Sequence, residues 1–206
     1  MGWLGSLPVA VVAAAVVGGV AASSPDPRDM VLQLSDLPGG FMVDAGGTTG
    51  YVSAEARAKA DGYPVAKLQR VASELKRDGY VIGYEADYKD KGSTILGIAY
   101  HVFVLKSVAV LFKDDATAKK ALDLQVKVCR KPAVRKRILR RIGEDSLLCS
   151  VQKLQSHIYV QAYALAWRSG RVVGYVELIG LAGSFPASEA VTLGERQQRR
   201  IAAATR

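Results

Sequence analysis

Hydrophobic residues recur along this chain with two different spacings, and the change between them marks where helices give way to strands. From Pro64 onward the apolar positions follow the 3.6-residue period of an amphipathic helix, and proline suits a first helical turn. A shorter helix is predicted over residues 54–60, where Ser53 can cap the first turn. Upstream, residues 31–41 predict a short amphipathic turn or helix. The first part of the body is therefore predicted to be helical.

The period changes to two over residues 80–88, where apolar side chains take every second position. This alternation is typical of a strand with one polar face. Residues 94–112 form a long apolar run that predicts one long strand, or two strands broken near Lys106. A helix is predicted next over residues 116–128, with an aspartate just before it to cap its first turn. The middle of the chain is thus predicted to run from strands into a helix.

The last part of the chain repeats this order. It predicts a strand over residues 146–153, a hairpin formed by 157–167 and 171–181, and a final helix over 187–203. Strands joined mainly by hairpins form an antiparallel sheet, whose faces the helices must cover. The predicted fold class is therefore α+β, with an antiparallel sheet packed against helices. Because both halves end a hairpin in a helix, two degenerate ββα halves are a further expectation.

Tyrosines are prominent in the first predicted strand. If that strand is regular, Tyr80, Tyr84 and Tyr88 lie on one face of the sheet. Tyrosine combines apolar area with a hydroxyl group, which suits a binding surface. The alternative is a core covered by a helix, with the hydroxyl groups at its rim.

The N-terminal residues carry the pattern of an export signal. Residues 1–25 contain no charged side chain, and residues 7–22 are a run of small and apolar residues of the length of a secretory leader. Small residues at positions 20–22 suit signal peptidase, although the basic residues usual at the start of a signal peptide are missing. The expected organisation is a signal peptide or N-terminal anchor over 1–22, a flexible mature start over 23–30 and one extracytoplasmic domain over 31–206. The expected location is secreted or associated with the cell envelope.

The chain contains two cysteines, Cys129 and Cys149. An even number of cysteines in an exported protein favours a disulfide bond. Such a bond between residues 20 positions apart would stabilise the fold by roughly 3 kcal/mol through the entropy of the unfolded chain. The alternative is a pair of buried thiols. Because the two cysteines are far apart in sequence, they predict neither a redox dithiol nor a zinc site.

Positive charge is concentrated in one stretch, residues 125–141, which we call the basic segment. It carries eight cations and no anion; subtracting these eight from the net charge of +9 leaves +1 for the rest of the chain. A helix is expected within it after Pro132. The cations are Lys127, Arg130, Lys131, Arg135, Lys136, Arg137, Arg140 and Arg141.

Concentrated positive charge attracts anions through the summed field of the side chains. An exported protein is not expected to bind nucleic acid, so the candidate partners are anionic lipid, a wall polymer or an acidic protein. Contact with a membrane is expected only through the leader or the basic segment. The alternative is a solvated helix face whose charge contributes only to solubility.

No catalytic, metal-binding or cofactor-binding motif is present in the sequence. His101 and His157 are isolated, whereas a metal site needs three or four ligands. The acidic pairs at 114–115 and 144–145 fall at predicted turns, where capping is their expected role. The leading hypothesis is therefore a non-catalytic extracytoplasmic module that binds an anionic surface, ligand or protein partner, without a cofactor. The alternatives are a carrier of an apolar ligand between sheet and helices, and a secreted hydrolase with an unrecognised site.

Three short stretches stand out: LSDLPGGF at 34–41, IGEDS at 142–146 and AWRSGRVVGY at 166–175 ahead of the last helix. Together they resemble a loose group of poorly characterised secreted proteins and lipoproteins from actinobacteria and related bacteria. The resemblance implies an envelope protein with an antiparallel sheet and packed helices, and it brings no catalytic residues. Unlike the lipoproteins of that group, this chain lacks the cysteine to which lipid is attached.

Overall fold

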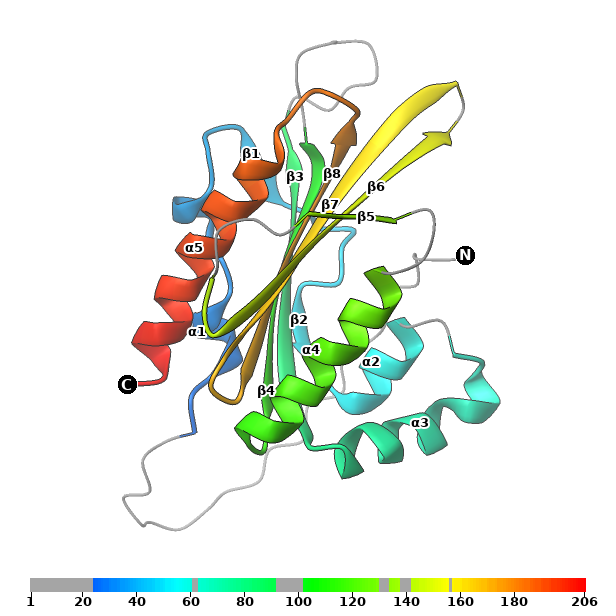
Figure 1. The fold of residues 1–206 in the computed structure, drawn as a ribbon, viewed down its shortest axis with the longest axis vertical. Coiled ribbons are helices and arrows are strands. Elements are labelled where there is room, and N and C mark those ends of the chain that lie inside the picture. The colour runs from blue at the N-terminus through cyan, green and yellow to red at the C-terminus, as the bar shows by residue number, and fades with distance from the viewer. Residues whose placement is uncertain (1–23, 61–62, 92–101, 130–133, 138–141, 156) are drawn as a thin grey trace.

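A computed structural model describes residues 24–60, 63–91, 102–129, 134–137, 142–155 and 157–206 (Figure 1). The described helices are α1 (Pro27–Met30), the 3-10 helix η1 (Leu34–Asp36), α2 (Ala54–Ala60), α3 (Val65–Arg77), α4 (Asp115–Cys129) and α5 (Ala187–Ala204). The described strands are β1 (Phe41–Val43), β2 (Gly50–Val52), β3 (Tyr80–Asp90), β4 (Val102–Phe112), β5 (Val134–Arg137), β6 (Asp145–Gln155), β7 (Ile158–Ser169) and β8 (Val172–Leu181).

The described strands form one antiparallel sheet. Their order is β1-β3-β4-β8-β7-β6-β5, and β2 also pairs with β3. Every pairing between the described strands is antiparallel. The predicted α+β class with an antiparallel sheet is therefore confirmed. Residues 94–101 of the long apolar run lie outside the described residues, and the rest of the run is a single strand through Lys106.

The helices cover both faces of the sheet (Figure 1). On one face α5 packs against β7 and β8, beside α1. On the other face α2, α3 and α4 pack over the sheet, where Ala72 and Ala118 join a small core around Tyr80. The segment predicted as a flexible mature start contains α1, whose Met30 is buried in the main core. The final helices of the two halves thus lie on opposite faces.

The main core lies between the sheet and α5, and glycines allow the backbones of α5 and of the sheet to pack closely there. Trp167 is fully buried there. A Cβ atom at Gly174 would lie 2.5 Å from the Trp167 indole, and one at Gly194 would lie 2.4 Å from Leu165. Glycine in the middle of a helix costs about 1 kcal/mol relative to alanine. Glycine is nevertheless required at position 194, because a side chain there would push α5 away from β7.

A buried chain of hydrogen bonds ties the N-terminal segment to the sheet and to α5. The Leu32 backbone NH donates to Ser107 Oγ over 3.0 Å, and the Ser107 hydroxyl donates to Gln197 Oε1 over 2.8 Å. Gln197 Nε2 in turn donates to the Val108 carbonyl, and the Tyr88 hydroxyl donates to the Leu32 carbonyl. Buried polar groups need such partners, because each unsatisfied group costs free energy. The network therefore fixes the position of the segment that follows α1.

A β-bulge divides the predicted row of tyrosines. The pairing of β3 with β4 shifts between Tyr80 and Ile82, which leaves Val81 as an extra, exposed residue. An extra residue reverses the alternation of faces beyond it. Tyr80 consequently packs with the core under α2, α3 and α4, whereas Tyr84 and Tyr88 pack with the core under α5. The expectation that the three tyrosines share one face is wrong for this reason.

Candidate binding surface

Part of the basic segment forms a strand where the sequence predicted a helix after Pro132. Residues 134–137 pair with β6 as strand β5, so the helix prediction is wrong there. Partner strand β6 offers a complete backbone ladder, which overrides the weak local preference of this short stretch. Of the predicted anion-binding residues, Lys127 lies in α4 and Arg135, Lys136 and Arg137 lie in β5. Arg130, Lys131, Arg140 and Arg141 lie outside the described residues.

Strand β5 occupies an edge of the described sheet. Its residues Arg135, Lys136 and Arg137 stand at the register positions of Ser150, Cys149 and Leu148 of β6, respectively. Three consecutive cations therefore follow the rim of the sheet. Charged residues are common on edge strands, and a row of cations at an edge suits an external anion.

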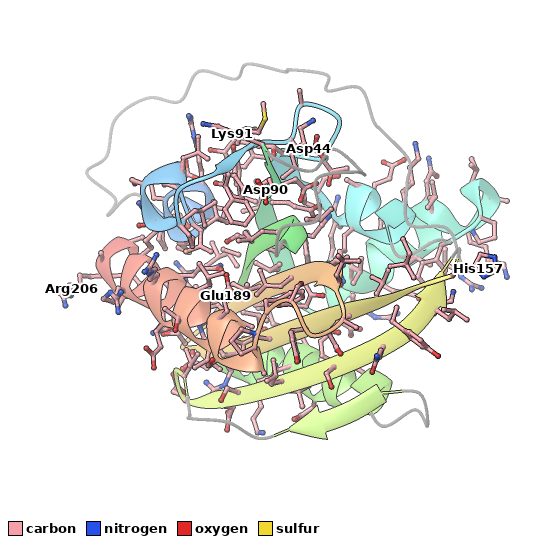
Figure 2. All side chains as sticks on the ribbon, turned by 90° about the horizontal axis from the view of Figure 1, so that it is seen from above. Asp44, Asp90, Lys91, His157, Glu189 and Arg206 are labelled. Atoms are coloured by element: carbon pink, nitrogen blue, oxygen red, sulfur yellow. The ribbon has the colours of Figure 1, made fainter. Side chains whose placement is uncertain are left out.

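Beside β5, the hairpin of β6 and β7 projects beyond the rest of the sheet (Figure 1). The last register pair of β7 with β8 joins Val160 to Leu181, so residues 154–159 extend beyond it. Figure 2 shows His157 at the far end of this hairpin, away from Arg206 at the C-terminus. His157 has a φ of 67° in the tight turn that joins the two strands. The hairpin end is thus a two-stranded projection.

The end of this hairpin is apolar and exposed. Leu154, Ile158 and Tyr159 are exposed to 54%, 48% and 58%, respectively. We call these three residues the apolar tip. Lys153 and His157, which adjoin them in sequence, are also exposed. A cluster of large apolar side chains on a projection differs from single exposed residues, because clustered exposure is typical of contact sites.

The cysteines lie near the same part of the molecule. Cys149 is buried in β6, at the register position of Lys136. Cys129 is the last residue of α4, and its side chain lies outside the described residues. The disulfide between Cys129 and Cys149 therefore stays a prediction. It would attach the C-terminal end of α4 to the strand beside β5.

A second group of charges is buried on the sheet face that carries α2, α3 and α4. The Lys106 ammonium group forms an ion pair with Glu85 and lies 3.4 Å from Asp87 Oδ1. Thr48 supports the two carboxylates: its backbone NH donates to Asp87 Oδ2 over 2.8 Å, and its hydroxyl donates to Glu85. Buried ions need such paired contacts, because each has lost its water. The geometry explains the cluster as a structural centre that joins β3, β4 and the loop before β2.

Glu177 of β8 completes this cluster as a third carboxyl group. Burial raises the pKa of Glu177, while Lys106 and a hydrogen bond from the Tyr175 hydroxyl act in the opposite direction. Burial also raises the pKa of Tyr175. A carboxyl group with a raised pKa is protonated more readily in the folded state than in the unfolded state, so ionisation destabilises the fold.

We therefore expect Glu177→Gln to change how stability depends on pH. The penalty for ionising Glu177 is absent below its ordinary pKa of 4.5 and develops as the pH rises through the raised folded value. Relative to the wild type, the variant should gain stability between pH 4 and pH 7. Urea unfolding of both proteins across this range measures the difference. A constant difference across the range would contradict the assignment.

A third charged group lines a hollow of about 470 Å³ between η1 and α5. Arg196 donates to the Asp36 carbonyl, and Arg200 donates to the Asp36 carboxylate. Two of the three arginines at this hollow thus already hold η1 against α5. Arg199 is exposed at its rim. The hollow is open and polar, and its contacts are accounted for by the packing of η1.

The remaining candidates for chemistry have structural contacts. The Thr117 backbone NH donates to Asp114 Oδ1 over 2.8 Å, which confirms the predicted helix cap and lowers the pKa of Asp114. Glu144 and Asp145 instead form ion pairs with Arg168, at 2.5 and 3.0 Å. His101 lies outside the described residues. Within the described part of the chain, no group of three or more His, Cys, Asp or Glu side chains is placed to hold a metal ion.

Within the described ranges, no helix has both the length and the apolar character needed to cross a bilayer. On the α5 side, the space between sheet and helix is filled by Trp167, Leu165 and Ile201. The carrier alternative would need its cavity somewhere other than this packed interior.

Comparison with known proteins gives one structural similarity. No protein-family model and no curated protein matches the chain. Among solved structures, the chain is similar to the extracellular domain of PknH from Mycobacterium tuberculosis, with 10% sequence identity and a TM-score of 0.47. The match covers 85% of this chain and 100% of that one. A likeness at this level carries no conclusion about what this chain binds.

Proposed function

We propose that this chain is an extracytoplasmic, non-catalytic module that binds an anionic surface through the basic segment. The observation that carries the proposal is the placement of Arg135, Lys136 and Arg137 on β5, at the rim of the sheet. The strand places three consecutive cationic residues at one edge of the sheet, which concentrates positive charge there. The extracytoplasmic part rests on the leader pattern of residues 1–22 and on the two cysteines.

Electrostatics favours an extended anionic partner over a small one. The three cations of β5 are consecutive residues of an extended strand and span roughly 7 Å of backbone at a rise of about 3.3 Å per residue. A surface with many anionic groups can contact all three cations, whereas a single small anion contacts one or two. The attraction must weaken with salt, because the Debye length falls to about 10 Å at 0.1 M ionic strength.

The proposal predicts a large loss of binding when the charges of β5 are removed. The β5 variant combines Arg135→Gln, Lys136→Gln and Arg137→Gln. Each Lys or Arg near an anionic membrane contributes about 1 kcal/mol, so the affinity for vesicles containing anionic phospholipid should fall about 100-fold. Binding to soluble polyphosphate should fall as well. Co-sedimentation with vesicles and a polyphosphate titration, each at several salt concentrations, measure the two effects.

A matched control separates position from net charge. The α3 variant combines Lys67→Gln, Lys76→Gln and Arg77→Gln, which are exposed residues of α3. Both variants change the formal net charge from +9 to +6, because each removes three cations. The α3 variant should bind nearly as well as the wild type. Unchanged binding of the β5 variant, or equal losses in both variants, would overturn the proposal.

A further inference from the structure

The apolar tip and the cations of β5 lie on the same part of the sheet, and together they match one kind of surface. Both flank β6: β5 pairs with residues 148–151 of β6, and Leu154 is three residues further along that strand. At about 3.3 Å per residue, the register position of Arg135 is roughly 13 Å from Leu154, and that of Arg137 is roughly 20 Å from it. The molecule thus has an apolar end and, just behind it, a cationic rim.

We propose that the anionic surface is a lipid bilayer, and that the apolar tip inserts into its interface while β5 contacts the headgroups. This inference rests on the proposed function and names its partner. Peripheral proteins bury apolar side chains about 5–10 Å into the boundary between headgroups and acyl chains. At that depth, strand β5 follows the tip toward the membrane surface, where its positive charge is attracted to the anionic headgroups.

The arrangement of the tip fits insertion by its end. Leu154 and Tyr159 are register partners, so they lie on one face of the hairpin. Ile158 precedes Tyr159 on β7 and therefore lies on the opposite face. A hairpin that packed one face on a protein partner would need its apolar residues on that face. Apolar residues on both faces suit a medium that surrounds the tip.

The backbone of the hairpin limits how deeply it can enter. The backbone groups of β6 and β7 satisfy one another between the strands, up to the pair of Gln155 with Ile158. Beyond β8, however, the outer edges of the two strands have no further strand beside them in the described sheet. Unpaired backbone groups are costly in hydrocarbon, so the tip is confined to the interface and does not span the bilayer.

The test changes the tip without changing any charge. The tip variant combines Leu154→Ser, Ile158→Ser and Tyr159→Ser in the full chain, so that any contribution of residues 1–22 remains constant. Its binding to vesicles containing anionic phospholipid should fall about tenfold or more, because the apolar area available for insertion is lost. Its binding to soluble polyphosphate should equal that of the wild type. Unchanged thermal unfolding will show that the exposed substitutions leave the fold intact.

The outcomes separate this inference from the proposed function. If the tip variant binds vesicles as the wild type does, insertion is excluded, while the binding of anions by β5 stands. If the β5 variant keeps its full affinity for both vesicles and polyphosphate, the proposed function itself fails. If the tip variant loses polyphosphate as well as vesicles, the tip serves another partner and the inference is overturned.

Fluorescence gives a direct readout of insertion. In Tyr159→Trp, the added indole should shift its emission to the blue on mixing with anionic vesicles, and lipids brominated on their acyl chains should quench it. The wild type provides the reference signal, since it contains Trp3 and the fully buried Trp167, both of which are unchanged in Tyr159→Trp. If the Tyr159→Trp protein binds vesicles and its emission shows neither a blue shift nor additional quenching, insertion is contradicted.

Discussion

Replacing Lys106 by methionine is expected to lower the free energy of unfolding by about 3–5 kcal/mol. The substitution removes the cation that Glu85 and Asp87 share, and both carboxylates stay buried. Among the described residues, Asp87 Oδ1 accepts no hydrogen bond, so the ammonium group of Lys106 is its main compensation. A buried charge that loses its partner costs far more than an exposed one. Urea unfolding at neutral pH measures the loss.

Lys89→Met on the same side of the molecule provides the matched control. Lys89 Nζ lies 3.1 Å from Asp44 Oδ1, but the two side chains are exposed to 40% and 25%. Exposed ion pairs contribute less than about 1 kcal/mol, so this variant should be nearly as stable as the wild type. Adding Glu85→Gln and Asp87→Asn to Lys106→Met should recover most of the loss. If Lys106→Met and Lys89→Met lower the free energy of unfolding by equally small amounts, water must screen the charges of Lys106, Glu85 and Asp87, which would contradict the buried cluster.

Replacing Trp167 by alanine is expected to cost about 3–5 kcal/mol, because it opens a cavity in the main core. The indole is fully buried, and its Nε1 donates to Gln198 Oε1 over 2.7 Å. The substitution therefore also leaves a side-chain amide of α5 without its donor. Calorimetry or urea unfolding measures the loss, and a cost below about 1 kcal/mol would contradict the packing described for this core.

A double-mutant cycle with Gly174→Ala tests the packing more sharply. Alone, Gly174→Ala should destabilise by about 1–3 kcal/mol, because its Cβ would lie 2.5 Å from the indole of Trp167. In the Trp167→Ala background that contact no longer exists, so the same substitution should cost little or add stability. The two changes should thus be strongly non-additive. Additive costs would mean that the indole does not limit the space at Gly174.

Most of the fold could be predicted because periodicity is a local property of sequence. Spacing placed the helix that starts after Pro64, the hairpin of β7 with β8 and the last helix close to where the structure has them. The strands β1 and β2 could not be predicted, since three residues are too few to show a period. A helix was wrongly predicted at β5, because its four residues take their conformation from pairing with β6 and not from their own pattern.

The charge of the candidate surface could be predicted from residues 125–141, but the buried polar groups and the apolar tip could not. Gln197 belongs to a polar stretch of the last helix, and its burial depends on Ser107, which is 90 positions away. The cluster around Lys106 likewise joins residues 21 positions apart through the sheet. The apolar tip was invisible for a different reason: Ile158 and Tyr159 look like ordinary strand residues, and only the end of β8 at Leu181 leaves them exposed.

The edges of the sheet also bear on how copies of this chain behave in concentrated solution. One edge carries β1 and β2, with three residues each, and the other carries β5, with four, whereas β3, β4 and β6 have eleven. A short edge offers few hydrogen bonds to an incoming strand, and three adjacent cations repel an identical strand. The same β5 that is proposed to meet an anionic partner therefore keeps copies from joining edge to edge. Neutralising its charges would remove that protection against aggregation.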